Sequence, residues 1–187
     1  MQKEHEIICA GFGGQGVLSM GSIIAYAGMI EGKEVSWMPS YGPEMRGGTA
    51  NCIVIVADNR ISSPIISKFD SAIVLNQPSL DKFESAVKPG GLLMYEKSTI
   101  INPPTRKDID IVCIPAIEEA DKLKAKQVAN MVMVGAFLEK QPLVKIETIV
   151  NTLKKVLPEH RHKLIPVNEQ ALKRGRELVK ETAQVSV

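Results

Sequence analysis

Apolar residues along the first two thirds of the chain alternate between short continuous runs and stretches with helical spacing. The continuous runs predict buried strands, because a strand that is covered on both faces loses the alternation of apolar and polar residues. These runs occupy residues 5–10, 34–38, 50–57, 71–76, 92–95 and 110–115. Helical spacing predicts helices over residues 17–30 and 78–87. Strands that alternate with helices of this length indicate an α/β layered fold.

The pattern changes after Pro115, where helical segments follow one another without intervening strands. They cover residues 116–126, 128–138, 146–157 and 167–182. We therefore predict a three-layer α/β/α fold with a mostly parallel sheet, a glycine-rich strand–turn–helix at the N-terminus and a helical C-terminal part. Residues 1–187 are expected to form a single α/β domain, on which residues 142–187 pack as a helical extension. The last helix carries the cations Lys173, Arg174, Arg176 and Lys180, which are expected to form a solvated face, with a contact to a partner as the alternative.

Composition narrows the functional classes. A net charge of +2 and an aromatic content of 4% argue against nucleic-acid binding. No run of about 18 apolar residues is present, and the N-terminus lacks the pattern of a signal peptide, so we expect a cytoplasmic protein that does not span a membrane. Cys9, Cys52 and Cys113 each lie in an apolar, strand-like segment without a Cys-x-x-Cys pattern. They are expected to be small core residues rather than metal ligands.

The first candidate site is the glycine-rich segment Gly11, Gly13, Gly14, Gln15 and Gly16, which follows a predicted strand and opens a predicted helix. Glycines let a ligand approach the backbone, and the free N–H groups at a helix start attract an anion. A dinucleotide site would also need an acidic residue about 20 positions later, at the end of the second strand. That strand instead ends in Pro39 and Ser40, which argues against NAD or FAD. A tight turn that only packs helix on sheet remains the alternative.

The second candidate site is the loop before the third strand, which contains Tyr41, Glu44, Arg46, Gly47 and Gly48. Arg46 is suited to hold a carboxylate or phosphate through two hydrogen bonds, and Glu44 either pairs with it or meets a partner subunit. A local Glu44–Arg46 pair on the surface is the alternative. No Ser/His/Asp or Cys/His set accompanies these residues, so the chain is expected to contribute part of a site and no catalytic residue in isolation.

Residues 11–17 and 40–48 together resemble the gamma subunit of 2-oxoacid:ferredoxin oxidoreductases. The resemblance covers most of the chain and includes residues 75–79, which precede a predicted helix. The Tyr-Gly-Pro-Glu-Met-Arg-Gly-Gly segment is more similar to the 2-oxoglutarate and 2-oxoisovalerate types than to the pyruvate type.

The resemblance implies a role in a multi-subunit, thiamine-diphosphate-dependent enzyme. Such enzymes oxidatively decarboxylate a 2-oxoacid, transfer the acyl group to coenzyme A and pass electrons to ferredoxin. Thiamine diphosphate lies between the alpha and beta subunits, and iron–sulfur clusters lie in the beta subunit or a ferredoxin-like delta subunit. The gamma subunit is then expected to bind no cofactor or metal alone, to complete the assembly, and to be inactive by itself. A free-standing nucleotide-binding oxidoreductase and a pure scaffold subunit remain alternatives.

Overall fold

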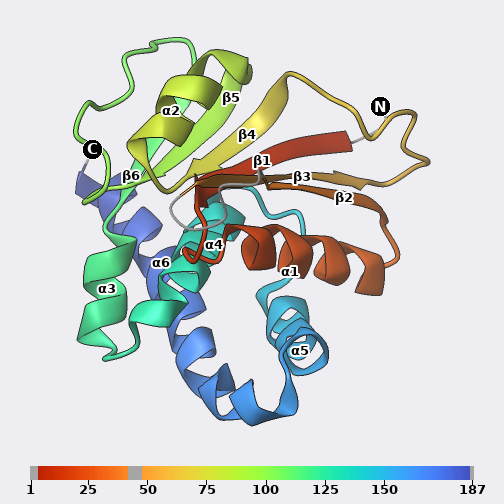
Figure 1. Ribbon diagram of the computed structural model, residues 1–187, viewed down its shortest axis with the longest axis vertical. Coiled ribbons are helices and arrows are strands. Elements are labelled where there is room, and N and C mark those ends of the chain that lie inside the picture. Colours follow the sequence, from red (N-terminus) through yellow and green to blue (C-terminus); the bar gives the residue numbers. More distant parts are fainter. Residues whose placement is uncertain (1–3, 42–47, 186–187) are drawn as a thin grey trace.

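The computed structural model describes residues 4–41 and 48–185, which form one central sheet with helices on both faces (Figure 1). The strands are β1 (Glu4–Phe12), β2 (Glu34–Tyr41), β3 (Thr49–Ala57), β4 (Phe69–Val74), β5 (Val87–Glu96) and β6 (Asp110–Ile114). The α-helices are α1 (Val17–Ile30), α2 (Gln77–Phe83), α3 (Ala116–Lys122), α4 (Ala129–Lys140), α5 (Ile146–Val156) and α6 (Ile165–Val185). Three short 3₁₀ helices are η1 (Glu84–Ala86), η2 (Lys126–Val128) and η3 (Glu159–Leu164).

The six strands lie in the order β2-β3-β1-β4-β5-β6, so β2 and β6 form the edges. β1, β4, β5 and β6 pair in parallel, whereas β3 pairs antiparallel with both β1 and β2. β3 is therefore the reversed strand, and the prediction of a mostly parallel sheet in an α/β/α fold is confirmed. This arrangement brings the end of β1, the end of β2 and the start of β3 to the same end of the sheet.

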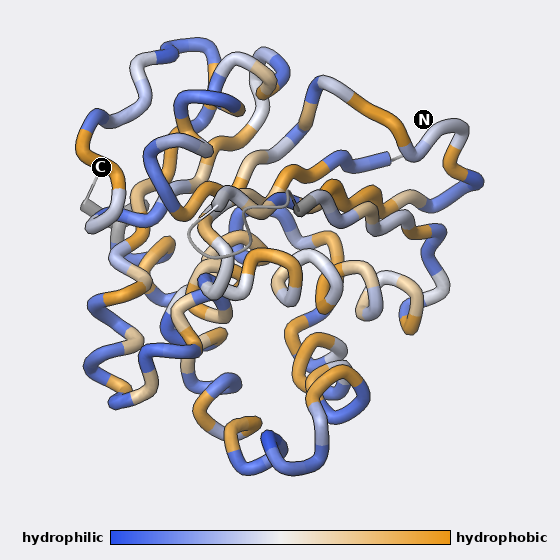
Figure 2. The backbone as a smooth tube through the Cα atoms, viewed as in Figure 1, coloured by the Kyte–Doolittle hydropathy of each residue, from blue (hydrophilic) through white to orange (hydrophobic). Residues whose placement is uncertain are grey.

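The two faces of the sheet bury separate apolar cores. On β1, Ile7 and Cys9 face the layer that contains α1, α4, α5 and α6, while Ile8 and Ala10 face the layer that contains α2. Figure 2 shows hydrophobic residues concentrated in the central strands and hydrophilic residues in the surrounding loops. Burying one large aliphatic side chain stabilises the fold by roughly 1.5–3 kcal/mol, so the helix-rich face contributes much of the stability.

Helices α4 and α6 pack with their backbones in direct contact. A Cβ atom on Gly135 would lie 2.0 Å from the Leu172 carbonyl oxygen, and one on Gly175 would lie 2.0 Å from the Val132 carbonyl oxygen. Only glycine permits this approach from both sides. α6 is thereby an integral part of the fold.

Several elements differ from the predicted ones for physical reasons. Val87 was expected in a helix but begins β5, because it is buried and pairs with Phe69 of β4. β2 extends through Pro39 into the predicted loop, which an edge strand tolerates because it has no neighbour on one side. The prediction that all three cysteines are core residues is wrong for Cys113, which is exposed. Cys113 lies on edge strand β6, on the face opposite to Val112, which packs against the helices.

Within residues 4–41 and 48–185, none of the helices combines the length and the apolar character needed to cross a bilayer.

Candidate ligand-binding site

The glycine-rich turn joins the end of β1 to the start of α1. Gly14 and Gly16 have φ angles of 95° and 77°, in the left-handed region that favours glycine. Gly11 is required by close packing, because a Cβ atom there would lie 2.7 Å from Gln15 Oε1 and 2.8 Å from Val17 Cγ2. Gly16 caps α1 without a side chain, so no cap occupies the N–H groups of the first helical turn. Such free N–H groups attract an anion.

Two amide side chains hold this turn in place. Gln15 Oε1 accepts a hydrogen bond from Phe12 N at 2.6 Å, and Gln15 Nε2 donates to the Leu75 carbonyl oxygen at 3.1 Å. Asn130 Nδ2 donates to the Gly16 carbonyl oxygen at 3.3 Å. No local sequence pattern marks Asn130 as part of this turn, because it lies 114 residues from Gly16.

The second candidate segment, which ends in Gly48, lies at the same end of the sheet as the glycine-rich turn. Gly13 N donates a hydrogen bond to the Gly48 carbonyl oxygen at 3.1 Å, which joins the two candidate segments directly. The backbone of Tyr41 ends β2 beside this contact. Three of the predicted residues lie outside the described residues: Glu44, Arg46 and Gly47.

A cavity of about 410 Å³ opens beside the glycine-rich turn. One wall is the turn and the first residues of α1. Another is formed by Leu153 of α5, Leu157 directly after α5, and Arg161 and Leu164 of η3. We refer to α5 and η3 together as the α5–η3 wall. Among the described residues that line this cavity there is no Asp or Glu, and Arg161 is the one charged side chain. The lining therefore favours an anionic ligand.

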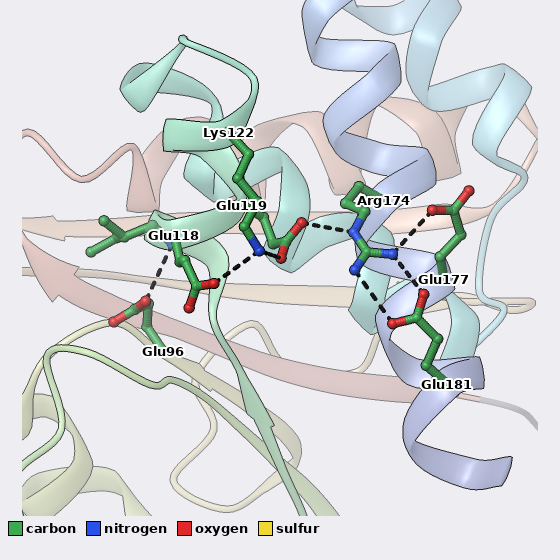
Figure 3. A network of polar contacts seen from close by, with 8 residues as sticks. Glu96, Glu118, Glu119, Lys122, Arg174, Glu177 and Glu181 are labelled. Atoms are coloured by element: carbon green, nitrogen blue, oxygen red, sulfur yellow. Dashed lines mark hydrogen bonds and ion pairs between the residues drawn. The ribbon is translucent and has the colours of Figure 1, made fainter. Parts of the chain in front are cut away.

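A second cavity, of about 240 Å³, lies behind the turn and is lined in part by Gln15 and Glu96. Glu96 is buried, yet its carboxylate is engaged. Oε2 accepts hydrogen bonds from Ser98 N at 2.7 Å and Thr99 N at 2.9 Å, and Oε1 accepts from Ile117 N at 3.2 Å. Glu96 therefore fixes the turn after β5 and the start of α3, and its contact with α3 is drawn in Figure 3.

Cys9 and Cys52 lie opposite each other in β1 and β3 and are fully buried. The hydrogen bond with Cys52, together with burial, raises the pKa of Cys9 well above its ordinary value, so this thiol stays protonated at neutral pH. Cys52 Sγ donates to the Val17 carbonyl oxygen at 3.6 Å, which supports the start of α1. In the part of the chain that the structure describes, no three His, Cys, Asp or Glu side chains gather into a possible metal site.

The sequence matches the Pyruvate ferredoxin/flavodoxin oxidoreductase family over residues 6–178, which include the glycine-rich turn and the α5–η3 wall. The chain belongs to this family. The expectation from residues 11–17 and 40–48 is thereby confirmed at the level of the family.

Curated relatives within this oxidoreductase family occur in two lengths. The ketoisovalerate oxidoreductase subunit VorA of Methanothermobacter thermautotrophicus is 36% identical over 181 residues, which are 97% of this chain and 38% of VorA. The chain therefore spans little more than a third of that relative. The 2-oxoglutarate synthase subunit KorC of Methanocaldococcus jannaschii is 31% identical over 185 residues, which are 97% of both chains.

Solved structures of the family also include a chain of similar length and a longer one. The gamma subunit of the keto/oxoacid ferredoxin oxidoreductase from Geobacter sulfurreducens has a TM-score of 0.80 at 27% identity, covering 95% of this chain and 99% of that one. The 2-oxoglutarate:ferredoxin oxidoreductase from Magnetococcus marinus, solved with 2-oxoglutarate, coenzyme A and succinyl-CoA bound, has a TM-score of 0.86 at 25% identity. It matches 96% of this chain and 31% of that chain. The fold thus occurs in the oxidoreductase family both as a separate chain and within a longer one.

The α5–η3 wall of this family member carries four exposed cations, Lys154, Lys155, Arg161 and Lys163. η3 is held to the end of α5 by His162, whose Nε2 donates to the Leu157 carbonyl oxygen at 2.9 Å. Nothing in the sequence connects the polar residues 158–163 with the glycine-rich turn. Only the packing of α5 and η3 beneath α1 brings the two segments to one cavity.

Proposed function

We propose that this chain is the gamma subunit of a multi-subunit 2-oxoacid:ferredoxin oxidoreductase. The observation that carries the proposal is the family match over residues 6–178. Relatives of similar length, KorC of Methanocaldococcus jannaschii and the Geobacter sulfurreducens gamma subunit, are named as subunits of such enzymes. The complex would oxidatively decarboxylate a 2-oxoacid, transfer the acyl group to coenzyme A and pass electrons to ferredoxin.

The partners in this proposal are alpha and beta subunits, and a ferredoxin-like delta subunit in some assemblies. They would hold thiamine diphosphate and the iron–sulfur clusters. The residues described for this chain do not fit an iron–sulfur cluster, since no metal-ligating cluster forms among them and Cys9 and Cys52 are buried in the core. We therefore assign no chemical step to this chain, which would act by completing the assembly and orienting a ligand.

The cavity beside the glycine-rich turn suits part of coenzyme A, which is bound in the Magnetococcus marinus enzyme. Coenzyme A supplies the thiol that accepts the acyl group. Backbone N–H groups of the turn and of the start of α1 would orient its anionic part. The proposed ligand or interface residues are Gly11, Gly13, Gly14, Gln15, Gly16, Tyr41, Glu44, Arg46, Gly47 and Gly48.

The substrate we favour is 2-oxoisovalerate or 2-oxoglutarate. VorA and KorC, the relatives that are at least 31% identical over 97% of this chain, are named for these two acids.

Anaerobic purification of the tagged chain with its partners tests the proposal. We expect 2-oxoacid- and coenzyme A-dependent dye reduction by the complex, and none by the chain alone. Decarboxylation by the purified single chain would contradict the proposal, as would co-purified partners without this activity. Arg46→Ala should lower the activity of the complex more than its melting temperature, whereas equal losses would make the loop structural.

The runner-up, a free-standing nucleotide-binding oxidoreductase, makes a different prediction. It requires that NAD or FAD raise the melting temperature of the isolated chain. The end of β2 carries Pro39 and Ser40 where a ribose-binding acid would stand, so we expect no such increase.

A further inference from the structure

The four cations of the α5–η3 wall lack acidic partners. Within residues 4–41 and 48–185, the side chains of Lys154, Lys155, Arg161 and Lys163 form no ion pair and no hydrogen bond. The same two elements carry two carboxylates, Glu147 and Glu159, so the wall keeps a net positive charge. A surface of this kind attracts anions from solution.

One cation of this wall, Arg161, lines the same cavity as the start of α1. Arg161 lines the cavity from η3, whereas Gly13 and Gly16 line it from the turn. The uncapped helix start supplies partial positive charge, and the guanidinium supplies a full one. Two independent features therefore favour negative charge at one place.

The polar side chains near this cavity do not weaken its preference for an anion. Asn168 is 8% exposed and donates from Nδ2 to the Leu164 carbonyl oxygen at 2.6 Å. Asn130 donates to the Gly16 carbonyl oxygen. Both amide donors thus support the walls of the cavity, and the guanidinium of Arg161 remains available to a ligand.

We propose that Arg161 binds a phosphate group of the ligand that occupies this cavity, and that Lys154, Lys155 and Lys163 steer the anion toward it. This inference rests on the proposed function, in which the ligand is coenzyme A. Arg161 then determines specificity, because it distinguishes the phosphorylated coenzyme from an unphosphorylated thiol such as pantetheine. The lysines act through solvent, so their effect falls on the association rate and weakens with salt.

Calorimetric titration of the full chain with coenzyme A, dephospho-coenzyme A and pantetheine tests the role of Arg161. Loss of a charge-assisted hydrogen bond predicts that Arg161→Gln weakens coenzyme A binding by about tenfold or more. Pantetheine binding should be unchanged. If Arg161→Gln weakens the binding of dephospho-coenzyme A as much as that of coenzyme A, Arg161 binds the diphosphate. If it leaves the binding of dephospho-coenzyme A unchanged, Arg161 binds the third phosphate.

Arg60→Gln is the matched control. Arg60 is exposed, forms no ion pair among the described residues, and follows β3 at the opposite end of the sheet from the glycine-rich turn. The Arg60→Gln substitution removes the same charge without touching the cavity, so the affinity of this variant for coenzyme A should equal that of wild type. Arg161→Lys keeps the charge but loses the planar fork, and should recover part of the affinity.

Three results would overturn the inference. They are wild-type affinity of Arg161→Gln for coenzyme A, an equal loss of pantetheine binding, and no coenzyme A binding by either the chain or the reconstituted complex. In the complex, Arg161→Gln should raise the KM for coenzyme A and leave the KM for the 2-oxoacid unchanged. If the complex is inactive but the isolated chain still binds coenzyme A through Arg161, the proposed function fails and the inference stands.

Discussion

On α6, each of the four cations lies within ion-pair distance of a glutamate, whereas the four cations of the α5–η3 wall have no such partner in the part of the chain described here. Lys173 meets Glu169 at 2.9 Å, and Arg176 meets Glu139 at 2.7 Å. Arg174 bonds Glu119 and Glu181, each at 2.7 Å (Figure 3). The α6 charges therefore stabilise the fold, and those of the wall remain available to a ligand.

The difference shows why a run of basic residues is a poor guide to function by itself. The expectation of a solvated face on α6 overlooked the glutamates that come from α3 and α4, far away in the sequence. Only the packing of α3 and α4 against α6 reveals the pairs of Arg174 with Glu119 and of Arg176 with Glu139. The partner of Lys173 lies on α6 itself. The wall shows the reverse, because its cations at residues 154–163 have no acidic partner in the described structure, and Arg161 lines the cavity beside the glycine-rich turn.

The largest effect is expected from a substitution that loosens the packing of α6 on α4. In Gly175→Ala the new Cβ would meet the Val132 carbonyl oxygen, which the structure places 2.0 Å away. Because backbone must move, we expect the free energy of unfolding to fall by about 3 kcal/mol or more, measured by denaturant titration. Gln170→Ala, at an exposed position of α6, is the control and should change it by less than about 0.5 kcal/mol. Equal stability of the two variants would mean that α6 is not tightly docked.

The sequence predicted the strands and the mostly parallel sheet, because continuous apolar runs and their alternation with helical segments are visible in it. It did not predict the reversed direction of β3, since a continuous apolar run carries no information on strand direction. It also missed Asn130, which bonds Gly16, and Arg161, which lines the same cavity as Gly16, because both lie more than a hundred residues from that turn. Val87 shows the same limit, because its pairing with Phe69 outweighs the helical spacing around it.

The ion pairs of α6 can be removed without loosening its packing. Burial opposes ionisation of Glu119, but hydrogen bonds from Arg174 and Lys122 outweigh it and lower the pKa of Glu119 below the ordinary value of 4.5. Glu119 therefore stabilises the fold above this pH, and the stabilisation is lost as the pH falls through the lowered value. We expect Glu119→Gln to be less stable than wild type by about 2 kcal/mol near neutral pH. This difference in stability between the two proteins should disappear in acid.

Denaturant titrations of wild type and Glu119→Gln across the pH range from neutral to acid measure that gap. Glu118→Gln provides a control on the same helix, because Glu118 is exposed and its pair with Lys122 at 2.8 Å is solvated. A constant gap at all pH values would show that Glu119 acts through packing and not through its charge.

The smallest effect on stability is expected from removing the lysines of the α5–η3 wall. Lys154 and Lys155 form no ion pair in the described structure, so the double variant Lys154→Gln/Lys155→Gln loses no folded-state contact of these charges. We expect the free energy of unfolding to change by less than about 0.5 kcal/mol. The association rate of coenzyme A, measured by stopped flow, should fall at low salt and approach the wild-type rate as salt screens the charges. Lys173→Gln on α6 should show the opposite behaviour, with a small loss of stability and an unchanged association rate. A clear loss of stability in the double variant would place these lysines with the α6 cations and remove the distinction between the two regions.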